Sequence, residues 1–308
     1  MNARIFIGRT QVDSLPANDR GLAYGDGLFE TMRVHRGDVP WWDAHWSRLE
    51  HGAARLQISL PDASVVLEQA SKLFGQELFD QQLFDQKLFD QQLFDQELFD
   101  QELFDQELFD QDHGVLKLIV TRGASGRGYR RVAGAEPNWV LSRHRLPAKP
   151  CGSGLMLRWC DTRLAIQPAL AGIKHCNRLE QVIARGEWHD DGIDDGLMCD
   201  SEGFVVGATS ANLFVLREGG WMTPMVDRCG IAGVCRAWCM TDLAAVETRL
   251  TIAQVELADA IFLCNAVRGI LPVAQLVRRA WSPHPQVTAL QARLARVHPA
   301  FASDLEVP

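Results

Sequence analysis

The order of apolar and polar residues predicts a sheet covered by helices in the first half of the chain. Four segments have the alternating or continuous apolar pattern of strands, and they cover residues 4–7, 11–15, 113–122 and 138–146. In residues 43–56 the apolar side chains recur on one face of a helix. This face carries Trp42, Trp46, Leu49, Ala53 and Leu56, so we expect it to pack into a core.

The second half of the chain mixes the same two periodicities, so the predicted fold class is α/β, with α and β elements interspersed (α+β mixed). Strands are expected at 154–164, 194–206 (a hairpin), 207–215 and 259–265, and helices at 177–189, 234–246 and 287–297. Between the halves, Pro147–Gly154 is rich in proline and glycine, which is typical of a linker. We therefore predict a small N-terminal α/β domain at 1–147 and a larger C-terminal domain at 148–308.

Seven tandem copies of Gln-x-Leu-Phe-Asp occupy residues 76–110. On an α-helix five residues advance by about 500°, so successive Leu-Phe pairs form no single apolar stripe. An odd period also alternates between the two faces of a strand. Because Leu, Glu, Gln and Lys favour helices and no Gly or Pro interrupts the array, we predict a partly exposed helical insertion at 76–112. It is either a tolerated insertion without a part in the chemistry or an arm that binds a partner.

Composition and charge exclude some classes of partner. The chain has 308 residues, of which 47% are hydrophobic and 23% charged, as in globular proteins. Its net charge of -8 argues against nucleic acid as a partner, and no apolar run is long enough to cross a membrane. The start of the chain does not resemble a signal peptide, so we expect a cytoplasmic protein whose eight cysteines are reduced.

Three of these cysteines lie close together in the sequence. Cys229, Cys235 and Cys239 are six and four residues apart, but no CxxC pair or matching histidine pair accompanies them. We therefore predict no metal site.

One lysine stands out because of its surroundings. Lys174 follows Gly172-Ile173 and precedes an amphipathic helical run within Leu170–Gln181. In an apolar setting a lysine has a lowered pKa, because burial penalises the ammonium form. Its neutral amine can then attack a carbonyl and form a Schiff base. The alternative is an ordinary surface lysine at the start of a helix.

Three further segments could hold an anion. Arg48 lies beside the apolar face of the 43–56 helix and is either a solvated charge or an anion ligand. Gly230–Arg236 is a glycine-punctuated turn that opens a helix, and the free N–H groups at a helix start can cradle a phosphate. The segment Arg122–Arg131 combines three glycines with four arginines, so it is either a carboxylate-binding loop or an exposed basic loop.

Several short motifs follow one another in a specific order. They are Tyr24–Thr31, His45 with Arg48, Gly126–Tyr129, Ala171–Gln181, Ala211–Phe214, Gly230–Arg236, Cys264–Ala266 and Leu271–Val273. Together they resemble the fold-type IV pyridoxal-phosphate enzymes of the class IV aminotransferase family, and within them the 4-amino-4-deoxychorismate lyases. The resemblance spans almost the whole chain except the repeat. Lys-His-x-Asn-Arg-Leu-Glu-Gln at 174–181 and Gly-Arg-Gly-Tyr at 126–129 are closer to the lyases than to the aminotransferases.

This resemblance implies a two-domain enzyme with pyridoxal 5'-phosphate as cofactor. Lys174 would hold the cofactor as a Schiff base and then act as general acid and base. Arg178 would lie near the cofactor ring. The phosphate ligands implied are Arg48, the backbone N–H groups of Val234 and Cys235, and the Asn265-Ala266 loop. The substrate carboxylates would be bound by Arg127 and Tyr129, and the family is typically dimeric.

The reaction implied converts 4-amino-4-deoxychorismate, a carboxylate-bearing amine, to 4-aminobenzoate and pyruvate in folate biosynthesis. One departure from the family pattern bears on it. Gly207 stands where the family places a glutamate that keeps the pyridine nitrogen protonated. Without that carboxylate the ring is a poorer electron sink, which favours a lyase over an aminotransferase, or a weaker enzyme, unless another group substitutes.

Two alternatives remain open from the sequence. One is a fold-type IV aminotransferase that acts on a D-amino acid or a branched-chain amino acid. The other is a catalytically impaired scaffold that uses the repeat as a binding arm.

Overall fold

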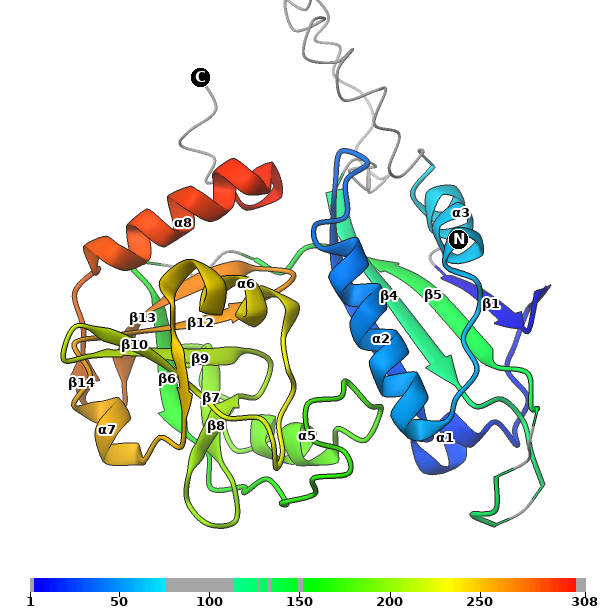
Figure 1. Ribbon diagram of the computed structural model, residues 1–308, viewed down its shortest axis with the longest axis horizontal. Helices are drawn as coiled ribbons and strands as arrows, with labels where there is room; N and C mark the ends of the chain where they lie inside the picture. The colour runs from blue at the N-terminus through cyan, green and yellow to red at the C-terminus, as the bar shows by residue number, and fades with distance from the viewer. Residues whose placement is uncertain (1–2, 76–112, 127, 132–133, 149–151, 303–308) are drawn as a thin grey trace, which may run out of the picture.

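The structure is a computed structural model that describes residues 3–75, 113–126, 128–131, 134–148 and 152–302 (Figure 1). The helical insertion predicted at 76–112 lies outside these residues. Two sheets divide the described chain, one built before residue 145 and one built after residue 154. The predicted mixed α/β class is confirmed.

The first sheet is antiparallel with strand order β2-β1-β5-β4-β3. Its strands are β1 (Ala3–Ile7), β2 (Thr10–Val12), β3 (Gly27–His35), β4 (His113–Thr121) and β5 (Asn138–His144). The helices of this half are α1 (Arg20–Tyr24), α2 (Trp42–Leu56) and α3 (Ala63–Phe74). Helices α2 and α3 lie over the sheet and share one apolar core with it. The sequence analysis did not predict α1 or α3.

Strand β3 alternates between two environments. Leu28, Met32 and Val34 are buried in the core that the sheet shares with the helices. Successive side chains of a strand point to opposite faces, so Phe29 and Thr31 lie on the face away from that core. Strand β3 lies at the edge of this sheet, where Leu28 forms a bridge with His175 of the C-terminal half.

The second sheet has the order β11-β10-β9-β12-β13-β6-β7-β8, and β14 pairs with β13. Its strands are β6 (Leu155–Trp159), β7 (Asp195–Cys199), β8 (Val205–Ala208), β9 (Asn212–Arg217), β10 (Gly220–Pro224), β11 (Val246–Thr248), β12 (Ala260–Asn265), β13 (Gly269–Leu276) and β14 (Arg279–Ala280). The helices of this half are α5 (Leu179–Arg185), α6 (Val234–Leu243), α7 (Ile252–Glu256) and α8 (Pro285–Val297), followed by the 3-10 turn Pro299–Phe301. Helices α6 and α8 pack with β9, β12 and β13 around the apolar side chains of Phe214, Phe262 and Leu290.

Several predicted elements are shorter than expected: the strand predicted at 11–15 ends at Val12, the helix predicted at 234–246 ends at Leu243, and two more differ as follows. The strand predicted to reach residue 164 ends at Trp159, because the backbone N–H groups of Asp161 and Thr162 donate to the Glu187 carboxylate instead of a strand. The helix predicted at 177–189 covers only Leu179–Arg185 and ends at Gly186. Among the helices of the described ranges, none is long and apolar enough to cross a membrane.

Candidate active site

Lys174 lies in a segment that hydrogen-bonds to both halves of the fold. The backbone N–H of Phe29 in β3 donates to the carbonyl of Lys174 at 3.0 Å, and that of Cys176 donates to Gly27 at 2.9 Å. Two residues before the lysine, Gly172 exchanges backbone hydrogen bonds of 3.0 Å with Gly230 and Ala232, just ahead of α6. The backbone around Lys174 is therefore fixed to the first sheet on one side and to the start of α6 on the other.

Close packing beneath the lysine reinforces this position. Ile173 is fully buried in the core of the first half, against α2. A Cβ at Gly52 of α2 would lie only 2.6 Å from the Ile173 side chain. The glycine therefore allows α2 to approach the lysine segment closely.

The Lys174 amine has the lowered pKa that a Schiff-base lysine needs. Burial, with a further contribution from the positive charge of Arg48, lowers its pKa to about 8. Its Nζ lies 4.3 Å from the centre of the Phe29 ring. The Lys117 amine approaches the same ring at 5.6 Å and also lowers the pKa of Lys174.

Arg48 is held by a buried carboxylate. Its Nε donates to Glu30 at 2.8 Å, its Nη2 also binds Glu30, and the same carboxylate lies 2.6 Å from Nδ1 of His45. Although burial opposes it, the charges and hydrogen bonds of Arg48 and His45 lower the pKa of Glu30 to about 2. Glu30 is therefore ionised and fixes the Arg48 guanidinium.

The remaining guanidinium nitrogen of Arg48 points to the start of α6. Arg48 Nη1 donates to the carbonyl of Ala232 at 3.0 Å, two residues before α6 begins at Val234. The first N–H groups of a helix have no acceptor within the helix, and the first turn of α6 contains no acidic residue. Arg48 therefore lies next to the first turn of α6, where N–H groups are available to an anion.

The Asn265-Ala266 turn lies beside this position. It follows β12, whose Cys264 has its sulfur within 4.8 Å of that of Cys235 in α6. The side-chain oxygen of Asn265 accepts the N–H groups of Val267 and Arg268 at 3.1 and 2.8 Å, which fixes the turn. Contacts in the structure therefore connect Lys174, Arg48, the start of α6 and the end of β12, and the role of these groups at a phosphate stays a prediction.

Arg178 is anchored next to the lysine. Its Nε donates to the carbonyl of His175 at 3.0 Å, and its Nη2 binds Nε2 of the same histidine. Arginine only donates, so His175 accepts and is neutral, and burial together with Arg178 lowers the pKa of His175 to about 4. The charge of Arg178 also contributes to the lowered pKa of Lys174.

The predicted substrate ligands are not brought to Lys174 in the described chain. Arg127 lies outside the described residues. Tyr129 is 85% exposed, its ring lies 5.4 Å from that of Tyr24, and its carbonyl accepts from Arg20 at 3.4 Å. The role of both residues stays a prediction.

Gly207 lies in β8, and it offers no side chain to the cofactor ring. A Cβ at this position would meet the carbonyl oxygen of Ala211 at 3.0 Å, closer than an ordinary contact. The backbone there is arranged for a glycine.

Two charged residues near Lys174 were missed by the sequence analysis, although each leaves a signal. Glu30 is the charged residue on the core side of an otherwise apolar alternation, where a carboxylate requires a partner. Lys117 is the charged residue inside the apolar run 114–120. It pairs across the sheet with Thr31, on the face that carries Phe29.

Comparison with known proteins identifies the family. The family model of amino-transferase class IV matches residues 27–80 and 92–276. The chain belongs to this family. The aminodeoxychorismate lyase of Vibrio harveyi is 31% identical over 84% of this chain and 86% of its own length. A putative branched-chain-amino-acid aminotransferase of Methanocaldococcus jannaschii is 24% identical over 89% of this chain and 88% of its own length.

A solved structure of 4-amino-4-deoxychorismate lyase from Pseudomonas aeruginosa has the same fold. It aligns with a TM-score of 0.76 and 37% identity over 95% of this chain and 98% of its own. Class IV enzymes use pyridoxal phosphate, so this chain is a pyridoxal-phosphate-dependent enzyme.

The residues present fit this cofactor. Arg48 and the start of α6 could bind its phosphate. Gly233 allows the backbone before α6 to pack against Asn212, because a Cβ at 233 would lie 2.1 Å from the side-chain oxygen of Asn212. The cofactor aldehyde could react with the Lys174 amine, whose pKa is about 8. Position 207 is a glycine and provides no carboxylate for the pyridine nitrogen.

Proposed function

We propose that this chain is a lyase that converts 4-amino-4-deoxychorismate to 4-aminobenzoate and pyruvate, a step toward folate. The observation that carries the proposal is the placement of Lys174, with its lowered pKa, between Arg48 and Lys117. The similarity to named lyases supports the choice of reaction: identity reaches 37% over nearly the whole chain with the Pseudomonas aeruginosa structure. The solved branched-chain aminotransferase of Escherichia coli shares the fold at 16% identity.

When bound, pyridoxal phosphate supplies an electron sink for the carbon next to the substrate nitrogen. Arg48, the α6 start and the Asn265-Ala266 turn would hold its phosphate. The Lys174 amine, once released by the substrate amine, would remove the proton from that carbon and later displace the aromatic product. Elimination of pyruvate leaves an aromatic ring.

Lys117 is proposed as a ligand of a substrate carboxylate. Its amine lies on the same face of the sheet as Phe29, and both lysine amines approach that ring. Of these two amines Lys174 is committed to the chemistry. Lys117 would then attract and orient the anion, with Phe29 as the apolar wall beneath it.

The test is a pyruvate assay with purified enzyme and the aminodeoxychorismate substrate, run without any amino acceptor. A lyase forms pyruvate and 4-aminobenzoate in equal amounts under these conditions. An aminotransferase would need an oxo acid to turn over, and a D-alanine aminotransferase of Bacillus licheniformis, 23% identical over 88% of this chain, marks that alternative. Turnover only with an oxo acid would reject the lyase, and no turnover with either would favour the impaired scaffold.

We also propose that the enzyme is a homodimer whose interface includes α1 and α5. Unusually exposed apolar side chains occur on and near these helices: Leu22 (74%), Tyr129 (85%), Leu179 (74%), Val182 (64%) and Ile183 (60%). The two helices are linked because the Asn177 side chain donates to the carbonyl of Gly25 at 3.1 Å. Apolar surface of this extent is typical of a protein contact, and in such a dimer Tyr129 would act across the interface.

The oligomeric state is measured by light scattering after size-exclusion chromatography. The wild type is expected to be a dimer, and Val182→Glu with Ile183→Glu a monomer. Exposed Val246 (62%), which lies in β11 and far from these helices in the sequence, gives the matched control Val246→Glu. A wild-type monomer, or a dimer that survives the double change, would reject this interface.

A further inference from the structure

Three cysteine sulfurs meet beneath the start of α6. Cys235 and Cys239 are one turn apart in α6, and Cys264 is the last residue but one of the neighbouring strand β12. Their Sγ atoms all lie within 4.8 Å of one another, and the side chains are at most 1% exposed. The sequence had grouped Cys229 with Cys235 and Cys239, but in the fold Cys264 takes its place.

The spacing of the sulfurs suits a three-coordinate soft ion. Metal–sulfur bonds are about 2.3 Å long, so three sulfurs around one centre lie about 4 Å apart or closer. This separation falls within the observed limit of 4.8 Å. Small rotations of the side chains would bring all three sulfurs onto one atom.

The surroundings of the cluster decide which ion fits. Phe214, Phe262 and Leu290 belong to the same apolar cluster, so a net charge there is costly. Burial and the hydrogen bond with Cys235 raise the pKa of Cys264 well above its usual range, and the hydrogen bond with Cys239 and burial do the same for Cys235. A bound ion that leaves no net charge is therefore favoured in these apolar surroundings.

Zinc does not match this site. Among the described residues no histidine or carboxylate joins the three sulfurs, so a tetrahedral set of four ligands is incomplete. Three thiolates around a divalent ion would also leave a net negative charge in the apolar core.

We propose that Cys235, Cys239 and Cys264 form a binding site for trivalent arsenic. In the reaction with arsenous acid, three As–O bonds break and three As–S bonds form. Each thiol proton leaves with one hydroxide as water, and arsenic stays trivalent. The product carries no charge and needs only three ligands, which matches the three sulfurs and the apolar side chains around them.

The test measures arsenite binding to the cofactor-loaded enzyme and does not depend on the lyase reaction. One arsenic per chain is expected, with three sulfur neighbours and no oxygen in the arsenic K-edge absorption spectrum. Cys239→Ala and Cys264→Ala should each weaken binding by at least about tenfold, the lower end of what even an indirect partner costs at a metal site. Cys160→Ala is the matched control, because Cys160 is also buried (4% exposed) but lies outside the cluster.

Thermal melting verifies that each variant is folded, and the wild-type spectrum tests the proposal even where a variant fails to fold. Absence of bound arsenic in the wild type, or oxygen in its first shell, would overturn the site. Full affinity in folded Cys239→Ala, loss of affinity in Cys160→Ala, or zinc bound more tightly than arsenic would do the same.

Discussion

The phosphate end and the substrate end of the candidate active site differ in how many of their proposed ligands are already in position. At the phosphate end, Glu30 fixes Arg48, Arg48 reaches the α6 start, and Gly172 joins the lysine segment to that same turn. At the substrate end, Tyr129 is exposed and Gly207 offers no side chain to the ring. The proposed phosphate ligands are therefore already in place, whereas among the described residues proposed to bind the substrate only Lys117 approaches the same Phe29 ring as Lys174.

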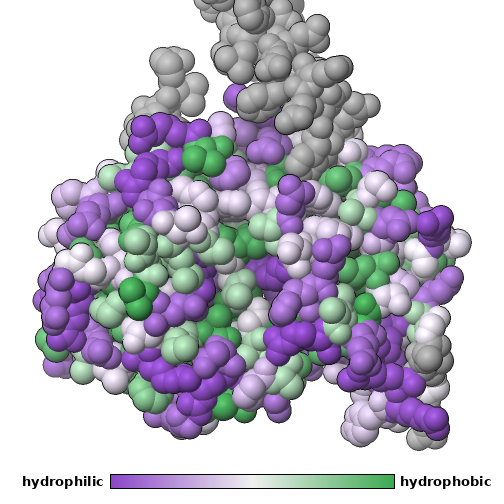
Figure 2. Space-filling model, in the orientation of Figure 1, coloured by the Kyte–Doolittle hydropathy of each residue, from purple (hydrophilic) through white to green (hydrophobic). Residues whose placement is uncertain are grey.

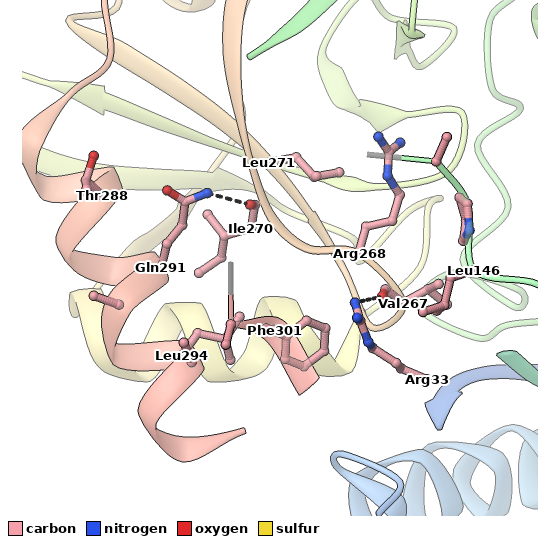
Figure 3. A pocket seen from close by; sticks show the side chains of 15 residues that line it. Arg33, Leu146, Val267, Arg268, Ile270, Leu271, Thr288, Gln291, Leu294 and Phe301 are labelled. Carbon is pink, nitrogen blue, oxygen red and sulfur yellow. Dashed lines mark hydrogen bonds between the residues drawn. The ribbon is translucent and has the colours of Figure 1, made fainter. Parts of the chain in front are cut away.

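A separate cavity of about 360 Å³ lies behind the phosphate end, between α8, the β12–β13 turn and residues 146–148 (Figure 3). Val267 and Arg268 line it directly after the Asn265-Ala266 turn, and Arg33 donates to the carbonyl of Val267 at 3.1 Å. The space-filling view shows polar and apolar side chains intermixed on this face of the molecule (Figure 2). Arg33 in the cavity wall thus holds the backbone that follows the Asn265-Ala266 turn.

The largest expected effect is at Lys174. Lys174→Ala should lower the rate of 4-aminobenzoate formation by about 10⁴-fold or more, because it removes both the covalent anchor and the acid–base group. Product is followed by chromatography, and Lys72→Ala, an exposed lysine on α3, is the control. Activity in Lys174→Ala within tenfold of wild type would show that Lys174 is not the catalytic amine.

Loss of Glu30 should destabilise the fold. Glu30→Gln leaves the Arg48 charge uncompensated in a buried site, so the free energy of unfolding should fall by about 3–5 kcal/mol. Added pyridoxal phosphate should recover part of this loss, because its phosphate pairs with Arg48. Urea unfolding with and without cofactor measures both free energies. Equal losses of stability in the two conditions would show that Glu30 does not act on the phosphate site.

The lowered pKa of Glu30 also predicts how the stability of the fold changes with pH. The pKa of Glu30 is about 2 in the folded protein, below its ordinary value of 4.5, so ionised Glu30 stabilises the fold above pH 4.5. That contribution is lost as the pH falls from 4.5 toward 2. Glu30→Gln should therefore lose less stability than the wild type over this range.

Arg48→Ala tests the phosphate end directly. Hydrogen bonds to charged groups contribute about 1.5–3 kcal/mol, so affinity for pyridoxal phosphate should fall by about 10- to 150-fold. Affinity for pyridoxal, which lacks the phosphate, should change little. Fluorescence titration of the cofactor-free protein measures both, with Arg296→Ala on α8 as control. Equal losses for the two ligands would show that Arg48 does not bind the phosphate.

The pH dependence of cofactor uptake tests the Lys174 amine. Only the neutral amine reacts, so the rate of uptake by cofactor-free protein should rise about tenfold per pH unit below pH 8 and level off above it. The rate is read from the absorbance of the bound cofactor. A rate that keeps rising to pH 10 would indicate a lysine with an ordinary pKa.

The smallest effect is expected at Gly207, where the chain provides no side chain for the cofactor ring. Gly207→Glu should shift the absorbance of the bound cofactor and change the lyase rate by a few-fold, if the new carboxylate reaches the pyridine nitrogen. The 3.0 Å approach of the Ala211 carbonyl to a Cβ at 207 requires a local shift, which limits the effect. Gly207→Gln controls for size. An unchanged spectrum and rate would show that position 207 is irrelevant to the ring.

The sequence predicted the elements whose pattern is local. The apolar run of β4 and the one-sided face of α2 need no knowledge of distant contacts, and Lys174 and the α6 start were recognised from motifs. The end of β6 at Trp159 could not be predicted, because Glu187 captures the next N–H groups from 25 residues away or more. The three-sulfur cluster was missed for the same reason, since Cys264 enters from β12 and not from the neighbourhood of Cys235.

The double attachment of the lysine segment has a consequence for motion. Residues 172–176 act as a shared pivot, because their backbone belongs to the hydrogen bonding of both halves at once. Movement of either half away from the lysine would therefore have to break these backbone hydrogen bonds.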